Sequence, residues 1–172
     1  FVPGITGERI TSVSALGWGD KHPWLTENAY NNPFWNIASL MQTDKGHILR
    51  NNVFFLVAAS GERAQFFGNK ATLYMETSGV HESVLRFRVP ETPKSQYDLP
   101  LQDGGTLEIP EYWKSDMLPP AMRINSGHGG SAVFICAEFI NALLEDREPV
   151  LDLYEALAMN IPGIMAQQSA LR

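Results

Sequence analysis

The most apolar stretch of the chain covers residues 132–144 and predicts a buried helix. Polar residues interrupt or follow it only at Glu138, Asn141 and Glu145, spaced i, i+3 and i+7, so they form one narrow stripe of a helix. We therefore expect this helix to be buried on most of its circumference and laid across a sheet. Ser131 is suited to be its N-cap residue.

A second helix is predicted over residues 152–170. Asp152 followed by Glu155 resembles a capping box, and Pro149 separates this helix from the preceding one. Pro162 lacks the backbone N–H that a helix interior uses, so with Gly163 it should kink or break the helix near Asn160.

Alternating apolar and polar positions predict strands at residues 9–18, 34–42, 47–58, 63–67, 71–76 and 84–89, with tight turns at 43–46 and 68–69. The proline-rich segment 90–125 predicts a surface excursion with a short strand at 106–109 and a helical turn near Tyr112 and Trp113. The predicted fold class is α+β: a largely antiparallel, mixed open β-sheet with helices packed on one face. Its other face is available for oligomerisation, so we expect a homo-oligomer.

Composition narrows the class of protein. A length of 172 residues predicts a single domain, and a net charge of −6 without clustered Lys or Arg disfavours nucleic acid as a partner. The single cysteine, Cys136, forms no intrachain disulfide, and no metal-ligand spacing surrounds it, His47 or His81. No apolar run is long enough to span a membrane. We expect a cytoplasmic location, and export would need a signal in a preceding segment. The chain starts without methionine and stops within a helical pattern, so we expect it to be cut from a longer protein.

Two stretches are candidates for ligand binding. In Gly127-His128-Gly129-Gly130-Ser131 the glycines allow close backbone approach, and the following helix start suits an anion or polar ligand, with His128 at the mouth. The alternative is a tight turn into a core helix, with His128 hydrogen-bonded to a backbone carbonyl. The second stretch, the long loop 17–33, combines aromatic rings with Asn, Asp and His, as a sugar or polyol site requires. The alternative is that its tryptophans cap one end of a sheet.

Several motifs together resemble the end of oxidoreductases of the Gfo/Idh/MocA type, the glucose–fructose oxidoreductase and inositol dehydrogenase family. The motifs are 128–131, the helix containing 138–142, Arg147-Glu148-Pro149, the helix 152–170, the runs 7–20 and 30–36, and the turn 67–70, where Asn69 replaces a threonine. The resemblance covers nearly the whole chain, and the order and spacing of the motifs make it specific.

The resemblance implies a two-domain protein in which a Rossmann domain binds a nicotinamide dinucleotide and this chain, residues 1–172, is the C-terminal substrate-binding and oligomerisation domain. The Rossmann domain and the catalytic residues would lie outside the chain, so it should be inactive by itself. We expect no cofactor or metal site here, and NAD(P) only in the full-length parent; the glycines at 127–130 follow a proline-rich segment rather than a strand, unlike a dinucleotide fingerprint.

The first functional hypothesis is thus a domain of an NAD(P)-dependent oxidoreductase acting on a sugar or polyol. The substrate contacts it predicts are His128, Trp18, Asp20, His22, Asn31, Asn32 and Trp35. The alternatives are the C-terminal domain of an NAD-dependent glycosidase and a non-catalytic dimerisation module.

Overall fold

The computed structural model describes residues 2–19, 23, 27, 29, 32–55, 57–59, 61–75, 82–88, 101–106, 111–127 and 130–172, with only the backbone for 88 and 101–106. The chain forms two compact units, 1–60 with 135–172, and 61–134. Each unit is described by itself below. The predicted fold class is confirmed: the chain is α+β, and every described strand pair is antiparallel.

The first unit is built on a three-stranded sheet in the order β1-β2-β3, formed by Ile10–Trp18, Asn36–Thr43 and Ile48–Phe54. A short helix α1, Val2–Thr6, precedes it and was not predicted. The predicted turn at 43–46 is confirmed: Gly46 has φ +84°, a conformation that favours glycine, and its N–H donates to the Thr43 carbonyl at 2.9 Å.

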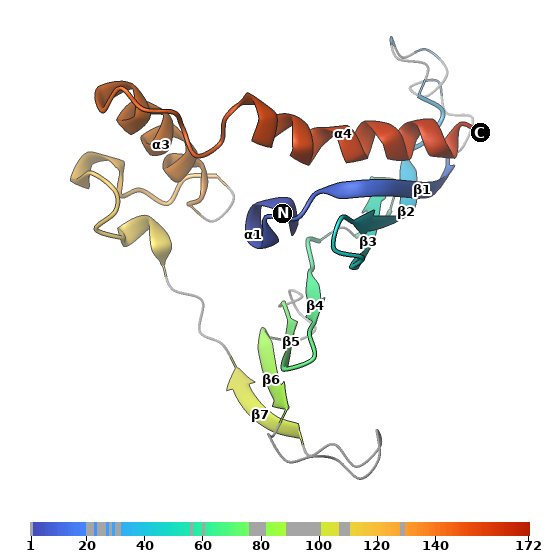
Figure 1. Cartoon of the computed structure of the whole chain (residues 1–172), viewed down its shortest axis with the longest axis horizontal. Coiled ribbons are helices and arrows are strands. Elements are labelled where there is room, and N and C mark those ends of the chain that lie inside the picture. The colour runs from blue at the N-terminus through green and yellow to red at the C-terminus, as the bar shows by residue number, and fades with distance from the viewer. Residues whose placement is uncertain are drawn as a thin grey trace. The chain divides into compact units, whose positions relative to one another are not determined.

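Helix α4, Leu153–Ala170, covers one face of this sheet (Figure 1). Ala15, Met41 and Ala166 form the buried centre of the contact. The Ala15 N–H, on the open edge of β1, donates to Ser169 Oγ at 3.0 Å, so α4 also satisfies an edge-strand donor. The predicted N-cap is confirmed, since Asp152 Oδ1 accepts the N–H of Glu155 at 2.8 Å. Of the predicted kink or break at Pro162, the break is wrong, because α4 continues through this buried residue.

Helix α3, Ala132–Leu144, has the predicted length but not the predicted burial. Only Val133, Ala137 and Ala142 are buried along it, while Ile135 and Phe139 are exposed. The expectation that α3 lies across the sheet is therefore wrong, and α4 occupies that place. An apolar pattern indicates that a helix face will be covered, but not by which part of the protein.

The second unit contains a four-stranded sheet in the order β4-β5-β6-β7, formed by Gln65–Phe67, Ala71–Tyr74, Val84–Arg88 and Leu101–Thr106. The first three strands confirm the prediction, whereas β7 lies before the predicted strand at 106–109. Its pairing with β6 shifts register between Val84 and Arg86. Such an irregularity accommodates Gly104 and Gly105 of β7, which lie in the stretch predicted to be a surface excursion.

Two 3-10 helices follow in this unit, η1 at Tyr112–Lys114, where a helical turn was predicted, and η2 at Pro120–Met122. Leu118 lies between them and is 1% exposed. Within the described residues, no helix has the length and hydrophobicity needed to cross a membrane.

Candidate functional site

The predicted substrate contacts divide into residues that the structure describes and residues that it does not. Asp20, His22, Asn31 and His128 lie outside the described residues. Trp18, Asn32 and Trp35 are described, and all three lie where β1 ends and β2 begins. The geometry of the candidate site is therefore built from this end of the β1-β2-β3 sheet.

The backbone of Trp35 connects the ends of two strands. Its N–H donates to the carbonyl of Trp18 at 3.2 Å, and its own carbonyl accepts the N–H of Phe55 at 3.3 Å. The ring of Phe34 covers Gly17 so closely that a Cβ there would lie 2.4 Å from Phe34 Cγ. Segment 34–35 is thus fixed against the sheet, and Gly17 is required for that close approach.

The Trp18 side chain lies on the sheet face opposite α4. Ala15 faces α4, and side chains alternate along a strand, so Leu16 and Trp18 point to the other face. The Trp18 ring contacts that of Phe54, with centroids 5.3 Å apart and planes tilted by 55°. This contact matches the alternative in which tryptophan caps the sheet end, although 47% of Trp18 stays exposed.

Asn32 is held by two protein donors. Its Oδ1 accepts the backbone N–H of Phe34 at 3.0 Å and Nε2 of Gln167, in the last turn of α4, at 3.1 Å. The oxygen of Asn32 is therefore committed within the protein. Gln167 was missed by the sequence interpretation because it lies 135 positions from Asn32 along the chain.

The start of α3, in the second unit, is shaped by a glycine and a tryptophan. Gly130 is buried with φ +93°, and its N–H donates to the carbonyl of Ser126 at 2.8 Å. A Cβ on Gly130 would lie 2.9 Å from both Cβ and Cε3 of Trp113. Trp113 therefore packs against Gly130 at the start of α3, a contact that the sequence interpretation did not anticipate.

One carboxylate–imidazole pair also escaped the sequence interpretation. Nδ1 of His47 lies 2.9 Å from both carboxylate oxygens of Glu8, whose side chain is 6% exposed. Hydrogen bonds from Thr43 and then His47 hold the pKa of Glu8 below its ordinary value. The pair closes the β2–β3 turn onto the start of β1, at the end of the sheet away from Trp18.

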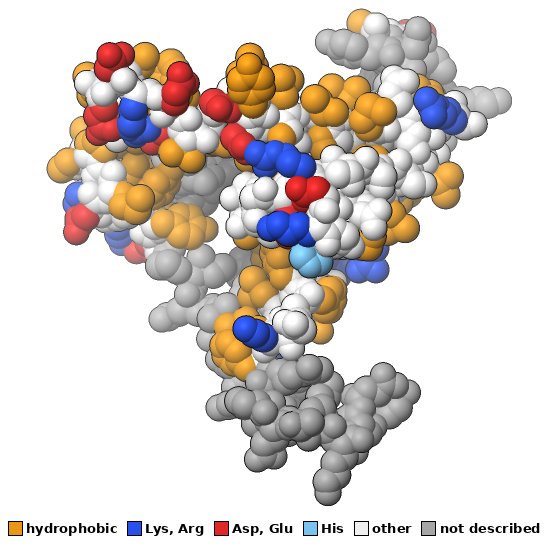
Figure 2. Space-filling model, in the orientation of Figure 1, with side chains coloured by type: hydrophobic (Ala, Val, Ile, Leu, Met, Phe, Trp, Pro, Cys, Tyr) orange, Lys and Arg blue, Asp and Glu red, His pale blue; other side chains and the backbone are white. Residues whose placement is uncertain are grey.

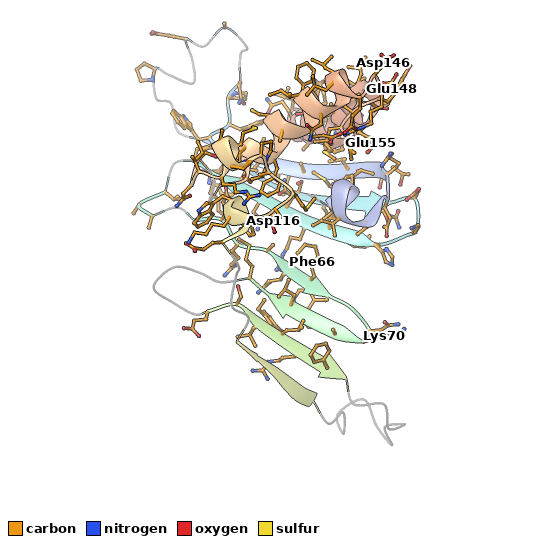
Figure 3. The ribbon with its side chains drawn as sticks, turned by 90° about the vertical axis from the view of Figure 1, so that its left-hand side faces the viewer. Phe66, Lys70, Asp116, Asp146, Glu148 and Glu155 are labelled. Atoms are coloured by element: carbon orange, nitrogen blue, oxygen red, sulfur yellow. The ribbon has the colours of Figure 1, made fainter. Side chains whose placement is uncertain are left out.

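Two further ion pairs tie the helices in place. Arg9, just before β1, pairs with Glu155 in the first turn of α4. Glu155 is labelled in Figure 3. Arg147 holds Glu138 with Nη1–Oε1 and Nη2–Oε2 distances of 2.7 and 3.0 Å, and the Val150 N–H donates to the same carboxylate at 2.8 Å. The Arg147 hydrogen bonds, then the one from Val150, lower the pKa of Glu138 to about 2. Glu138 is thus an anchor for the segment that follows α3.

What the described residues of this end of the sheet offer a ligand is the half-exposed ring of Trp18. Rings pack against the apolar faces of sugars, and amides hydrogen-bond their hydroxyls. Among the residues that the structure describes, no three His, Cys, Asp or Glu side chains gather as a metal site would need. The described strands pair only antiparallel, so they contain no βαβ unit of the kind that binds dinucleotides.

Comparison with known proteins gives a likeness in fold. No family model matches the sequence, and no curated protein does. Among solved structures, UDP-N-acetylglucosamine 3-dehydrogenase from Acidithiobacillus ferrooxidans matches with 11% identity and a TM-score of 0.58, over 99% of this chain and 46% of its own. Aldose-aldose oxidoreductase from Caulobacter crescentus, complexed with glycerol, matches with 12% identity and a TM-score of 0.57, over 99% and 42%.

A third match is an oxidoreductase from Agrobacterium radiobacter in complex with NAD+, L-tartaric acid and magnesium, with 12% identity and a TM-score of 0.59, over 99% of this chain and 44% of its own. These neighbours are oxidoreductases of the Gfo/Idh/MocA type. The family resemblance deduced from the sequence motifs is therefore confirmed as a likeness in fold. This chain spans less than half the length of the proteins it matches.

Proposed function

We propose that this chain is the substrate-binding and oligomerisation domain of an NAD(P)-dependent oxidoreductase that acts on a sugar or polyol. The observation that carries the proposal is the fold match, which extends over 99% of this chain and less than half of proteins that include a UDP-N-acetylglucosamine dehydrogenase and an aldose-aldose oxidoreductase. The sequence motifs and the half-exposed Trp18 ring support the same assignment.

In this proposal the nicotinamide dinucleotide binds to another part of the full-length parent. When bound there, it would accept or donate the hydride exchanged with a sugar carbon. The role of this chain is to bind and orient the sugar: Trp18 and Trp35 supply ring surface, and Asp20, His22, Asn31, Asn32 and His128 supply hydrogen bonds. A cytoplasmic location stays a prediction.

The open sheet face supports the oligomerisation role. Leu16, Leu40 and Ile48 point away from α4 and are 79%, 56% and 64% exposed. Apolar residues grouped on a sheet face are typical of a surface that another protein covers, and a second copy can present the same face in return. Leu16→Glu should shift the protein to monomer in light scattering, whereas Ile5→Glu in α1 should not.

Exposed apolar side chains on the helices support a role as one domain of a larger protein. Figure 2 shows them in orange along the outer sides of α3 and α4. They are Ile135, Phe139, Ile140, Leu143 and Leu144 on α3, and Leu153, Tyr154, Leu157, Ile161, Ile164 and Met165 on α4. Such a surface suits contact with a further domain.

The enzymatic proposal is tested on the full-length protein by following sugar-dependent reduction of NAD+ and NADP+, with D-glucose and UDP-N-acetylglucosamine as probes. His22→Ala and His128→Ala should each raise KM for the sugar turned over, while His47→Ala, away from the Trp18 end of the sheet, should leave it unchanged. If both site variants kept unchanged kinetics, His22 and His128 would not be substrate contacts. Release of free sugar from a glycoside without net NADH would identify a glycosidase instead. If the full-length protein carries out neither reaction, the remaining assignment for this chain is a dimerisation module.

A further inference from the structure

Gln167 connects helix α4 to the candidate substrate site. Its Nε2 donates to Asn32 Oδ1 at 3.1 Å, and the same oxygen accepts the Phe34 N–H at 3.0 Å. A backbone N–H can only donate, so the atom it binds must be the amide oxygen of Asn32. The side chain at position 167 must therefore supply a donor.

Gln167 is itself held on a fixed support. It lies in the last turn of α4. In the same turn, Ser169 Oγ accepts the N–H of Ala15 on β1 at 3.0 Å. Ala166, beside it, belongs to the buried core between α4 and the sheet. The hydrogen bond from Gln167 thus transfers the position of a packed helix to Asn32.

From Asn32 the constraint continues to the aromatic residues. Asn32 fixes the Phe34 N–H, the Phe34 ring covers Gly17, and the Trp35 backbone bonds to that of Trp18 at 3.2 Å. These contacts follow one another along a single path from Asn32 through Phe34 to Trp35. A displacement of Asn32 therefore displaces the segment that leads to Trp35.

We propose that Gln167 is a positioning residue of the substrate site, acting through Asn32 on Trp35. This inference rests on the proposed function, because it assumes that the site binds a sugar. Gln167 contacts no reacting atom in this scheme. It sets the geometry that the sugar meets, and misplaced binding groups reduce the efficiency of an enzyme strongly even when the chemistry is untouched.

The test compares Gln167→Glu with Gln168→Glu in the full-length protein. Glutamate keeps the size of glutamine but only accepts hydrogen bonds, so at 167 it opposes the Asn32 oxygen. Position 168 is exposed, so the same charge there stays in contact with solvent. Amide hydrogen exchange at Phe34 and Trp35 reports the positioning directly. It should accelerate in Gln167→Glu and stay unchanged in Gln168→Glu.

Kinetics with D-glucose and UDP-N-acetylglucosamine separate positioning from a purely structural role. Gln167→Glu should raise KM for the sugar that is turned over by about tenfold, with KM for the nicotinamide dinucleotide unchanged. Gln167→Lys, which restores a donor, should recover both exchange and KM. Unchanged exchange in Gln167→Glu would overturn the proposal, and so would faster exchange with an unchanged sugar KM. An unmodified protein that turns over no sugar would overturn the proposed function; faster exchange in Gln167→Glu would then assign Gln167 a structural role only.

Discussion

Substituting Gly130 by alanine should destabilise the turn that opens α3. Gly130 has φ +93°, which a residue with a Cβ adopts only at a cost of about 1–3 kcal/mol. The new Cβ would also lie 2.9 Å from Cβ of Trp113, an atom close to the backbone that cannot swing aside. Overpacking of this kind costs about 1–3 kcal/mol. We expect the free energy of unfolding to fall by about 2–6 kcal/mol.

The matched control is Gly127→Ala in the same turn. Gly127 lies outside the left-handed region, and a Cβ there would meet no atom within 4 Å, so the free energy of unfolding should change by less than about 1 kcal/mol. Urea unfolding followed by tryptophan fluorescence measures both variants. With a slope of about 1–3 kcal/mol/M, a loss of about 3 kcal/mol lowers the midpoint by about 1 M or more. Equal midpoints for Gly130→Ala and Gly127→Ala would refute the reasoning.

Two further predictions concern stability and its pH dependence. Leu118→Ala should lower the free energy of unfolding by about 2–5 kcal/mol, since Leu118 is 1% exposed, whereas Met117→Ala, at a residue 80% exposed, should change it by less than about 0.5 kcal/mol in denaturant unfolding. Arg147 lowers the pKa of Glu138 from 4.5 to about 2, so its stabilisation is complete above pH 4.5 and is lost as the pH falls towards 2. Glu138→Gln should remove this part of the acid dependence of Tm, and Glu148→Gln should retain it; identical profiles for the two variants would contradict the assignment.

Local chemistry made much of the fold predictable. The cap at Asp152 and the turn closed by Gly46 each depend on residues a few positions apart, and both were confirmed. Strand alternation located five of the six strands before β7 closely and extended β3 by a few residues. Strand β7 was misplaced because it lies in the proline-rich segment that predicts a surface excursion and contains two glycines, which weaken a strand, while pairing with β6 holds it in a sheet.

The contacts between distant segments were not predictable. His47 finds Glu8 across 39 positions, and Gln167 finds Asn32 across 135. No periodicity or spacing encodes such pairs, because they arise only when the sheet and α4 have formed. The exposure of Phe139 on α3 has a related cause. The apolar pattern of α3 predicts that another surface will pack against the helix, but it does not identify that surface.

The most direct test of the central claim is to purify the full-length protein without added cofactor and examine it for nicotinamide dinucleotide by absorbance and mass spectrometry. We expect bound NAD or NADP that becomes reduced when a sugar substrate is added. A full-length protein that carries no dinucleotide and has no affinity for one would contradict the proposed function, and this chain would then be a binding or assembly module.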